Sequence, residues 1–168
     1  GFGARIVPCE VAQADRNRVT DQVLAETGGN LVHPYNDARV IAGQATATLE
    51  LLADVPGLEV VMAPVSGGGL MSGTALAARA LAPGIACIGA EPEGARDAHD
   101  SLAAGERITG RSADTVCDGL RAELGPLTFR ILRERLEAIL LADDSEVVAA
   151  MRLVWERLKL VVEPSAAV

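Results

Sequence analysis

The feature that most constrains the fold is an apolar run that leads through clustered glycines into a helix-forming stretch. Residues 58–65 (LEVVMAPV) are apolar except for Glu59, which is typical of a buried strand, and residues 70–82 (LMSGTALAARALA) have helical composition. A serine and three consecutive glycines join them: Ser66, Gly67, Gly68 and Gly69. A glycine turn that opens a helix exposes backbone N–H groups at the positive end of the helix dipole, so this turn predicts an anion site, most often for phosphate. A tight connection that only lets strand and helix pack is the alternative.

Strand-like and helix-like segments alternate along the rest of the chain. The pattern predicts strands at 4–9, 30–37, 58–65, 85–92 and 137–142, and helices at 14–27, 38–55, 70–82, 96–105, 127–136 and 145–162. Asp143 or Asp144 is positioned to cap the last helix, with Glu146 available for a capping box. Strands separated by helices of this length imply βαβ units. We therefore expect an α/β fold of three layers, with a mainly parallel sheet flanked by helices.

Composition excludes several classes of protein. A net charge of −8 argues against a nucleic-acid partner, whose phosphates attract basic surfaces. No apolar run reaches the ~20 residues of a membrane span, and the first twenty residues lack the apolar core of a signal peptide. Three widely spaced cysteines fit a reducing compartment, and two histidines make a zinc site improbable. A soluble, cytoplasmic protein is expected.

The glycine turn also has a dinucleotide interpretation. Gly67, Gly69 and Gly73 form G-x-G-x-x-x-G, and Glu91 ends the next predicted strand, as a ribose-binding acid would. The spacing is one residue longer than the usual G-x-G-x-x-G. On this hypothesis the chain is a noncatalytic dinucleotide- or phosphate-binding domain.

Five motifs, in this order, point elsewhere: HPYNDARVIAGQATATLELL, VVMAPVSGGGLMSG, IGAEPEGARDA, TVCDGL and VWERLKLVVEPSAA. Together they resemble the serine racemase and serine/threonine dehydratase group of pyridoxal-phosphate (PLP) enzymes, which have fold type II, similar to the tryptophan synthase β subunit. The resemblance runs from Gly3 to Ala167. It implies that residues 1–36 are the end of a small domain, a strand–helix–strand unit, and that 37–168 are part of the large cofactor-binding domain.

The resemblance implies a set of cofactor contacts. Backbone groups of the glycine turn would hold the PLP phosphate, Gly119 would let the backbone approach the cofactor ring, and Glu163 would line the pocket. The implied cofactor-binding residues are Ser66, Gly67, Gly68, Gly69, Leu70, Gly119 and Glu163.

The resemblance also implies a cation site. Glu91, Asp97 and the backbone carbonyl of Ala95 would be its ligands, completed by waters. Oxygen ligands of this kind suit Mg²⁺, Ca²⁺ or Mn²⁺. From spacing alone, a strand-end glutamate and a helix-capping aspartate, both solvated, would be the simpler interpretation.

The substrate is implied to be a small amino acid. Arg16 matches an arginine that can close over a substrate carboxylate, and Tyr35 lies in a segment near the cofactor ring. Ala122 stands where some racemases carry a serine, which favours a dehydratase that converts a β-hydroxy amino acid into an α-keto acid and ammonia. Serine racemase and 3-hydroxyaspartate dehydratase are the alternatives, and the complete protein is expected to be a homodimer.

The Schiff-base lysine of such enzymes has no counterpart here. Lys159 is the only lysine, and it matches a helix away from the aldimine position. Both ends of the sequence also look cut. We therefore expect these 168 residues to be an incomplete part of a larger enzyme, with no catalytic residue of their own and no activity alone.

Overall fold

The computed structural model describes residues 3–10 and 13–168, and it divides into two units, up to residue 32 and from residue 33 onward. We describe each unit by itself. The first contains helix α1 (Gln13–Thr27), which is followed by Gly28 in the left-handed region at φ 64°. This confirms the helix predicted at 14–27.

The two strands predicted in this region are wrong. Residues 4–9 and 30–37 form no strand, and Ile6 and Val32 remain 88% and 66% exposed. A strand is stabilised by hydrogen bonds to a neighbour, and no other described strand pairs with either segment. Pro8 and Pro34 also remove one backbone donor each. Apolar composition alone suggested strands that lack a partner.

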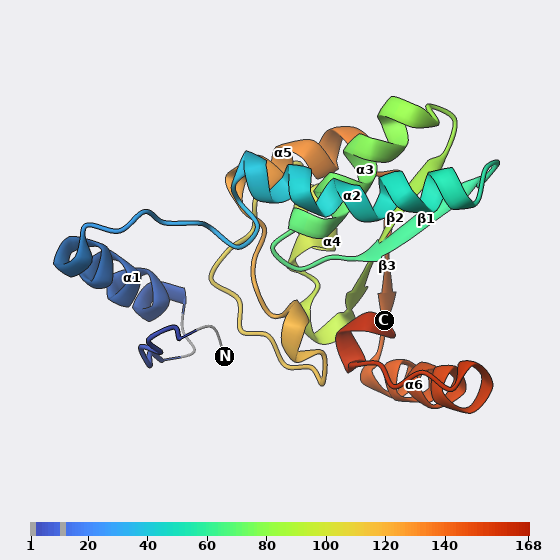
Figure 1. The fold of residues 1–168 in the computed structure, drawn as a ribbon. Coiled ribbons are helices and arrows are strands. Elements are labelled where there is room, and N and C mark those ends of the chain that lie inside the picture. Colours follow the sequence, from blue (N-terminus) through green and yellow to red (C-terminus); the bar gives the residue numbers. More distant parts are fainter. Residues whose placement is uncertain (1–2, 11–12) are drawn as a thin grey trace. The chain divides into compact units, whose positions relative to one another are not determined.

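The second unit is built on a three-stranded parallel sheet of order β1-β2-β3, formed by β1 (Val60–Pro64), β2 (Ala86–Pro92) and β3 (Ala138–Ala142). Val61 pairs with Cys87, and Gly89 pairs with Ile139. All three strands were predicted, and the parallel sheet flanked by helices confirms the α/β fold class (Figure 1).

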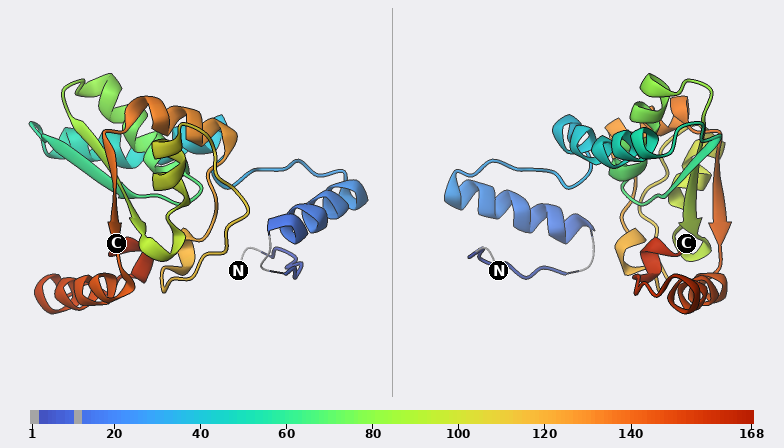
Figure 2. Two further views of the ribbon diagram at one scale, coloured as in Figure 1. Left: turned by 180° about the vertical axis from the view of Figure 1, so that it is seen from behind. Right: turned by 45° about the vertical axis from the view of Figure 1, so that its right-hand side comes forward.

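Five α-helices accompany the sheet: α2 (Ala38–Asp54), α3 (Gly69–Leu81), α4 (Asp97–Ala104), α5 (Pro126–Arg135) and α6 (Asp144–Leu158). Helix α3 packs on β1 and β2 and contacts α2 and α5, while α4 packs on β3 (Figure 2). Asp143 caps α6 in a reciprocal box with Glu146, as predicted. In the described part of the chain, no helix has both the length and the apolar character needed to cross a bilayer.

The core lies between the sheet and the helices α3 and α5. Val61, Cys87 and Ile139 of the three strands are buried, together with Met71 and Leu132 of the helices. The alternate residues of the edge strands are exposed: Met62 and Leu140 are each 51% accessible. Successive strand residues point to opposite faces, so the helices of the described unit bury one face of β1 and β3 and leave the other open.

Helices α2 and α3 cross closely at Gly73. A Cβ added there would lie 2.6 Å from the Ile41 carbonyl oxygen and 2.6 Å from the Ala45 backbone nitrogen of α2. We expect Gly73→Ala to lower the free energy of unfolding of the complete protein by about 1–3 kcal/mol, measured by urea denaturation. Gly84→Ala, whose Cβ would meet no atom within 4 Å, is the control and should change stability by less than ~0.5 kcal/mol. Equal stability of both variants would contradict the close crossing.

Candidate functional site

The glycine turn lies between β1 and the N-terminus of α3. Gly68 is the N-cap residue, with φ 86° and ψ 4°, and Gly67, Gly68 and Gly69 are all buried. Left-handed backbone of this kind is favourable only for glycine. The first N–H groups of α3 have no partner within the helix, so the turn presents donors at the positive end of the helix dipole. This geometry suits a phosphate.

The Tyr35 ring lies against this turn. A Cβ added at Gly67 would lie 2.4 Å from the ring carbons, and one at Gly69 would lie 2.8 Å from the Tyr35 Cβ. The imidazole of His33 meets the ring edge to face, with 4.6 Å between centroids, and its Nδ1 accepts the Asn36 N–H at 3.0 Å. The structure therefore brings Tyr35 to the glycine turn, and any side chain at Gly67 would occupy the same space.

Two hydroxyl groups fix the turn from the other side. The Ser66 hydroxyl donates to the Ala122 carbonyl at 3.1 Å and lies 3.0 Å from the Ala122 N–H. The Thr128 hydroxyl, in the first turn of α5, donates to the Gly67 carbonyl at 2.7 Å. Sequence analysis missed Thr128. The only sequence pattern that could have indicated its role is its position three residues after Gly125, at the start of a predicted helix.

A second cluster joins residues far apart in the sequence. The Gly119 N–H donates to the Ser165 hydroxyl at 3.0 Å, and a Cβ at Gly119 would lie 3.7 Å from the Glu163 carboxylate. The structure thus brings together Gly119 and Glu163, which were both predicted to face the cofactor. Ser165, which is buried and holds Gly119, was not predicted as a site residue.

Glu91 is the penultimate residue of β2 and is completely buried. Its two carboxylate oxygens accept the N–H groups of Ala98 at 3.1 Å and of His99 at 2.8 Å, in the first turn of α4. Removal from water raises the pKa of Glu91 to about 8, although these N–H groups favour the charged form. The alternative interpretation of a solvated strand-end glutamate is therefore wrong, because the side chain points into the protein and binds α4.

Asp97 lies beside Glu91 at the start of α4 and is 7% exposed. Its Oδ2 accepts the Leu124 N–H at 3.3 Å, and burial raises its pKa to about 6. Glu91 and Asp97 each disfavour ionisation when the other is charged, and neither makes an ion pair within the described part of the chain. Two buried carboxylates that form no ion pair fit a divalent cation, although the charge of Arg111 acts to lower the pKa of Asp97.

The direct ligands of such a cation would be few. Among residues 3–10 and 13–168, no three His, Cys, Asp or Glu side chains come together as a metal site would require. The two carboxylates would need the backbone carbonyl of Ala95 and several waters to complete a coordination shell. Ala95 is buried and lies two residues before Asp97.

The raised pKa of Glu91 predicts how stability without metal depends on pH. Between about pH 4.5 and 8 the folded state binds a proton at Glu91 that the unfolded chain has released. The contribution of this proton is fully present below about pH 4.5 and is lost as pH rises through 8. In EDTA, the free energy of unfolding of the complete protein should therefore be lower at pH 8 than at pH 6, measured by urea denaturation. If the free energy of unfolding of a Glu91→Gln variant fell with pH as steeply as that of the unchanged protein, the result would contradict this assignment.

Two further residues were singled out from the sequence. Arg16 is exposed on α1, in the first unit, so its role with the substrate stays a prediction. Lys159 ends α6 with φ 59°, and its Nζ donates to the Glu156 carbonyl at 2.8 Å. The single lysine of the sequence is therefore the C-cap residue of α6.

The parallel sheet and the glycine turn define an α/β protein whose turn presents backbone donors of the kind that suit a phosphate. Residues 1–168 match the family described as pyridoxal-phosphate dependent enzyme, and the chain belongs to it. Its fold is that of the fold type II members.

Three relatives illustrate the similarity. The chain is 46% identical to serine racemase of Oryza sativa subsp. indica and 47% identical to beta-hydroxyaspartate dehydratase of Paracoccus denitrificans (strain Pd 1222), covering 99% of this chain and 49% and 53% of those proteins. The solved structure of maize serine racemase superposes with a TM-score of 0.94 at 44% identity, covering 98% of this chain and 50% of that one. A solved threonine deaminase superposes with a TM-score of 0.93, also at 44% identity, covering 99% of this chain and 56% of that one. The chain thus spans about half the length of these relatives.

Proposed function

We propose that this chain is the phosphate-binding half of a PLP enzyme that removes water and ammonia from a β-hydroxy amino acid. The observation that carries the proposal is the buried glycine turn, held by Tyr35 on one side and by Thr128 on the other. A turn that is fixed in advance loses less conformational freedom when a phosphate binds, which favours binding.

Each predicted residue has a role in this proposal. Backbone N–H groups of Ser66, Gly67, Gly68, Gly69 and Leu70 bind the phosphate. Gly119 allows the cofactor ring to approach the backbone, Glu163 lines the pocket, and Arg16 and Tyr35 contact the substrate. When bound, PLP supplies an electron sink for the charge that develops at the substrate Cα. The amino group that anchors PLP lies outside these 168 residues.

The cation site is part of the same proposal. Glu91 and Asp97, with the Ala95 carbonyl, bind Mg²⁺, Ca²⁺ or Mn²⁺, all of which prefer oxygen ligands. The support is the burial of both carboxylates and the absence of an ion pair to either of them in the described part of the chain. A divalent ion would compensate the two charges and hold the end of β2 against α4.

Racemisation is the second candidate. It shares the loss of the Cα proton and differs in returning a proton to the opposite face. The relative from rice is named as a serine racemase, and the one from Paracoccus as a beta-hydroxyaspartate dehydratase, so both reactions have support among similar proteins. We favour elimination because Ala122 offers a methyl group where some racemases have a serine, and its N–H and carbonyl are bonded to Ser66.

The dinucleotide hypothesis loses its main support. A ribose is a large ligand that needs its acidic partner in an open cleft, whereas Glu91 is completely buried and only a small ion could be enclosed beside it. Family membership also favours PLP over a dinucleotide.

Purified complete protein tests the proposal. We expect a visible absorbance band of bound PLP that disappears on borohydride reduction, and formation of an α-keto acid and ammonia from serine, threonine or 3-hydroxyaspartate. Chiral analysis of the remaining amino acid separates the candidates, since accumulation of the opposite enantiomer without keto acid would establish racemisation instead. Retention of NAD without the absorbance band would favour the dinucleotide hypothesis.

A further inference from the structure

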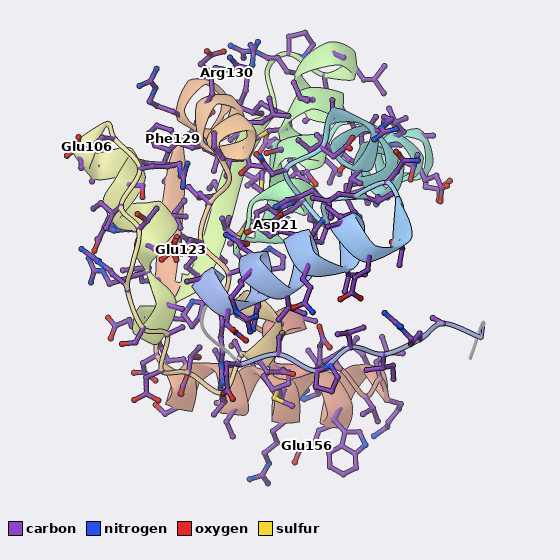
Figure 3. All side chains as sticks on the ribbon, turned by 90° about the vertical axis from the view of Figure 1, so that its left-hand side faces the viewer. Asp21, Glu106, Glu123, Phe129, Arg130 and Glu156 are labelled. Carbon is purple, nitrogen blue, oxygen red and sulfur yellow. The ribbon has the colours of Figure 1, made fainter. Side chains whose placement is uncertain are left out.

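Glu123 lies next to the proposed cation site, on the segment that connects it to the glycine turn. The neighbouring Leu124 donates its N–H to Asp97 at 3.3 Å, and the neighbouring Ala122 bonds to the Ser66 hydroxyl. Glu123 and Asp97 both line one cavity of about 180 Å³. Figure 3 labels Glu123 on the side of the molecule that carries α4.

The Glu123 side chain is held in place. It is half-buried, and its Oε1 accepts the Gly110 N–H at 2.5 Å, where Gly110 adopts φ 80°. One oxygen of the carboxylate thus anchors the 105–112 loop. A carboxylate has two oxygens, and the second can accept a hydrogen bond from a water in the cavity.

The arginines of the cavity do not neutralise this carboxylate. Arg96 and Arg111 both pair with Asp100, at 3.1 Å and 2.5 Å. Arg121 donates instead to the backbone carbonyl of Thr115. The described ion pairs of Arg96 and Arg111 are made with Asp100, although the charge of Arg111 still acts to lower the pKa of Asp97. Three carboxylates line the cavity: Asp97, Glu123 and the exposed Glu93.

We propose that Glu123 belongs to the cation site of this protein and acts through water, accepting a hydrogen bond from a water that the divalent ion binds. Contact through water agrees with the observation that no three acidic, His or Cys side chains of the described chain meet at ligand distance. Additional negative charge and a fixed outer partner both increase the affinity of a site for a divalent cation. This inference rests on the cation site of the proposed function.

The test is Mn²⁺ binding to the complete protein, measured by the loss of the free-Mn²⁺ EPR signal. Glu123→Gln keeps an oxygen for the Gly110 N–H and removes the charge, so we expect the loop anchor to remain and Mn²⁺ affinity to fall by about tenfold. Glu106→Gln removes the same charge from an exposed side chain beyond the end of α4, labelled with Glu123 in Figure 3. This control should bind Mn²⁺ as the unchanged protein does.

Thermal unfolding in EDTA distinguishes two roles of Glu123, as an anchor of the 105–112 loop or as a residue of the cation site. If Glu123 serves the cation, Glu123→Gln should unfold at the normal temperature without metal and gain less from added Mn²⁺. Normal Mn²⁺ affinity of this variant would overturn the inference and leave the cation site of Glu91 and Asp97 intact. Absence of Mn²⁺ binding to the unchanged protein would overturn the cation site itself, and the inference with it.

Discussion

Replacing Gly68 with alanine should weaken PLP binding to the complete protein by about a hundredfold. The residue sits at φ 86°, where an L side chain costs about 1–2 kcal/mol. Its Cβ would also lie 2.8 Å from Leu124 Cδ2 and 2.9 Å from Thr128 Cβ, both in buried side chains. Relieving such contacts costs about 1–3 kcal/mol. Moving the turn instead would displace the N–H groups from the phosphate, and about 3 kcal/mol corresponds to about a hundredfold in affinity.

The measurement is a titration of the cofactor-free protein with PLP, followed by absorbance. Gly84→Ala is the matched control, since its Cβ meets open space, and it should bind PLP normally. Far-ultraviolet circular dichroism checks that Gly68→Ala is folded. A folded Gly68→Ala variant with unchanged PLP affinity would show that the phosphate binds elsewhere.

Asp97→Asn should reduce Mn²⁺ affinity by more than about a hundredfold, beyond the effect expected for an outer partner. The substitution is mild for the fold, because the amide oxygen of asparagine can still accept the Leu124 N–H that Asp97 Oδ2 accepts at 3.3 Å. It removes one of two buried charges that a divalent cation would bind. Free-Mn²⁺ EPR gives the affinity, and urea denaturation in EDTA reports whether the fold is preserved.

Asp114→Asn provides the comparison for this experiment. Asp114 is exposed on a neighbouring loop and does not line the cavity of Asp97, so its loss should leave Mn²⁺ binding unchanged. If Asp97→Asn and Asp114→Asn bind Mn²⁺ equally well, the ion is attracted by the general negative charge of the protein and not by a site.

Most of the second unit could be predicted from sequence, because its signals are local. The strand at 60–64, the glycine turn and helix α3 follow from a continuous apolar run, three glycines and a helical stretch. The capping box of α6 follows from Asp143 and Glu146, three residues apart. Periodicity and capping report the structure that a segment adopts by itself.

The errors and omissions concern interactions that no local pattern contains. The segment 4–9 has strand composition but no described strand beside it, and sheet pairing is a property of two segments. Thr128 reaches Gly67 across 61 positions, and Ser165 reaches Gly119 across 46. The burial of Glu91 depends on how α4 closes over β2, which spacing alone does not give.

The segment 122–124 contacts the glycine turn and the carboxylate pair within three residues, through Ser66 at one end and Asp97 at the other. Thermodynamic linkage is reciprocal. If a bound divalent ion raises the affinity for PLP by some factor, bound PLP raises the affinity for the ion by the same factor. If the proposed ion raises the affinity for PLP, a chelator used during purification would lower that affinity by the same factor. The free magnesium concentration would then help set the fraction of protein that carries the cofactor.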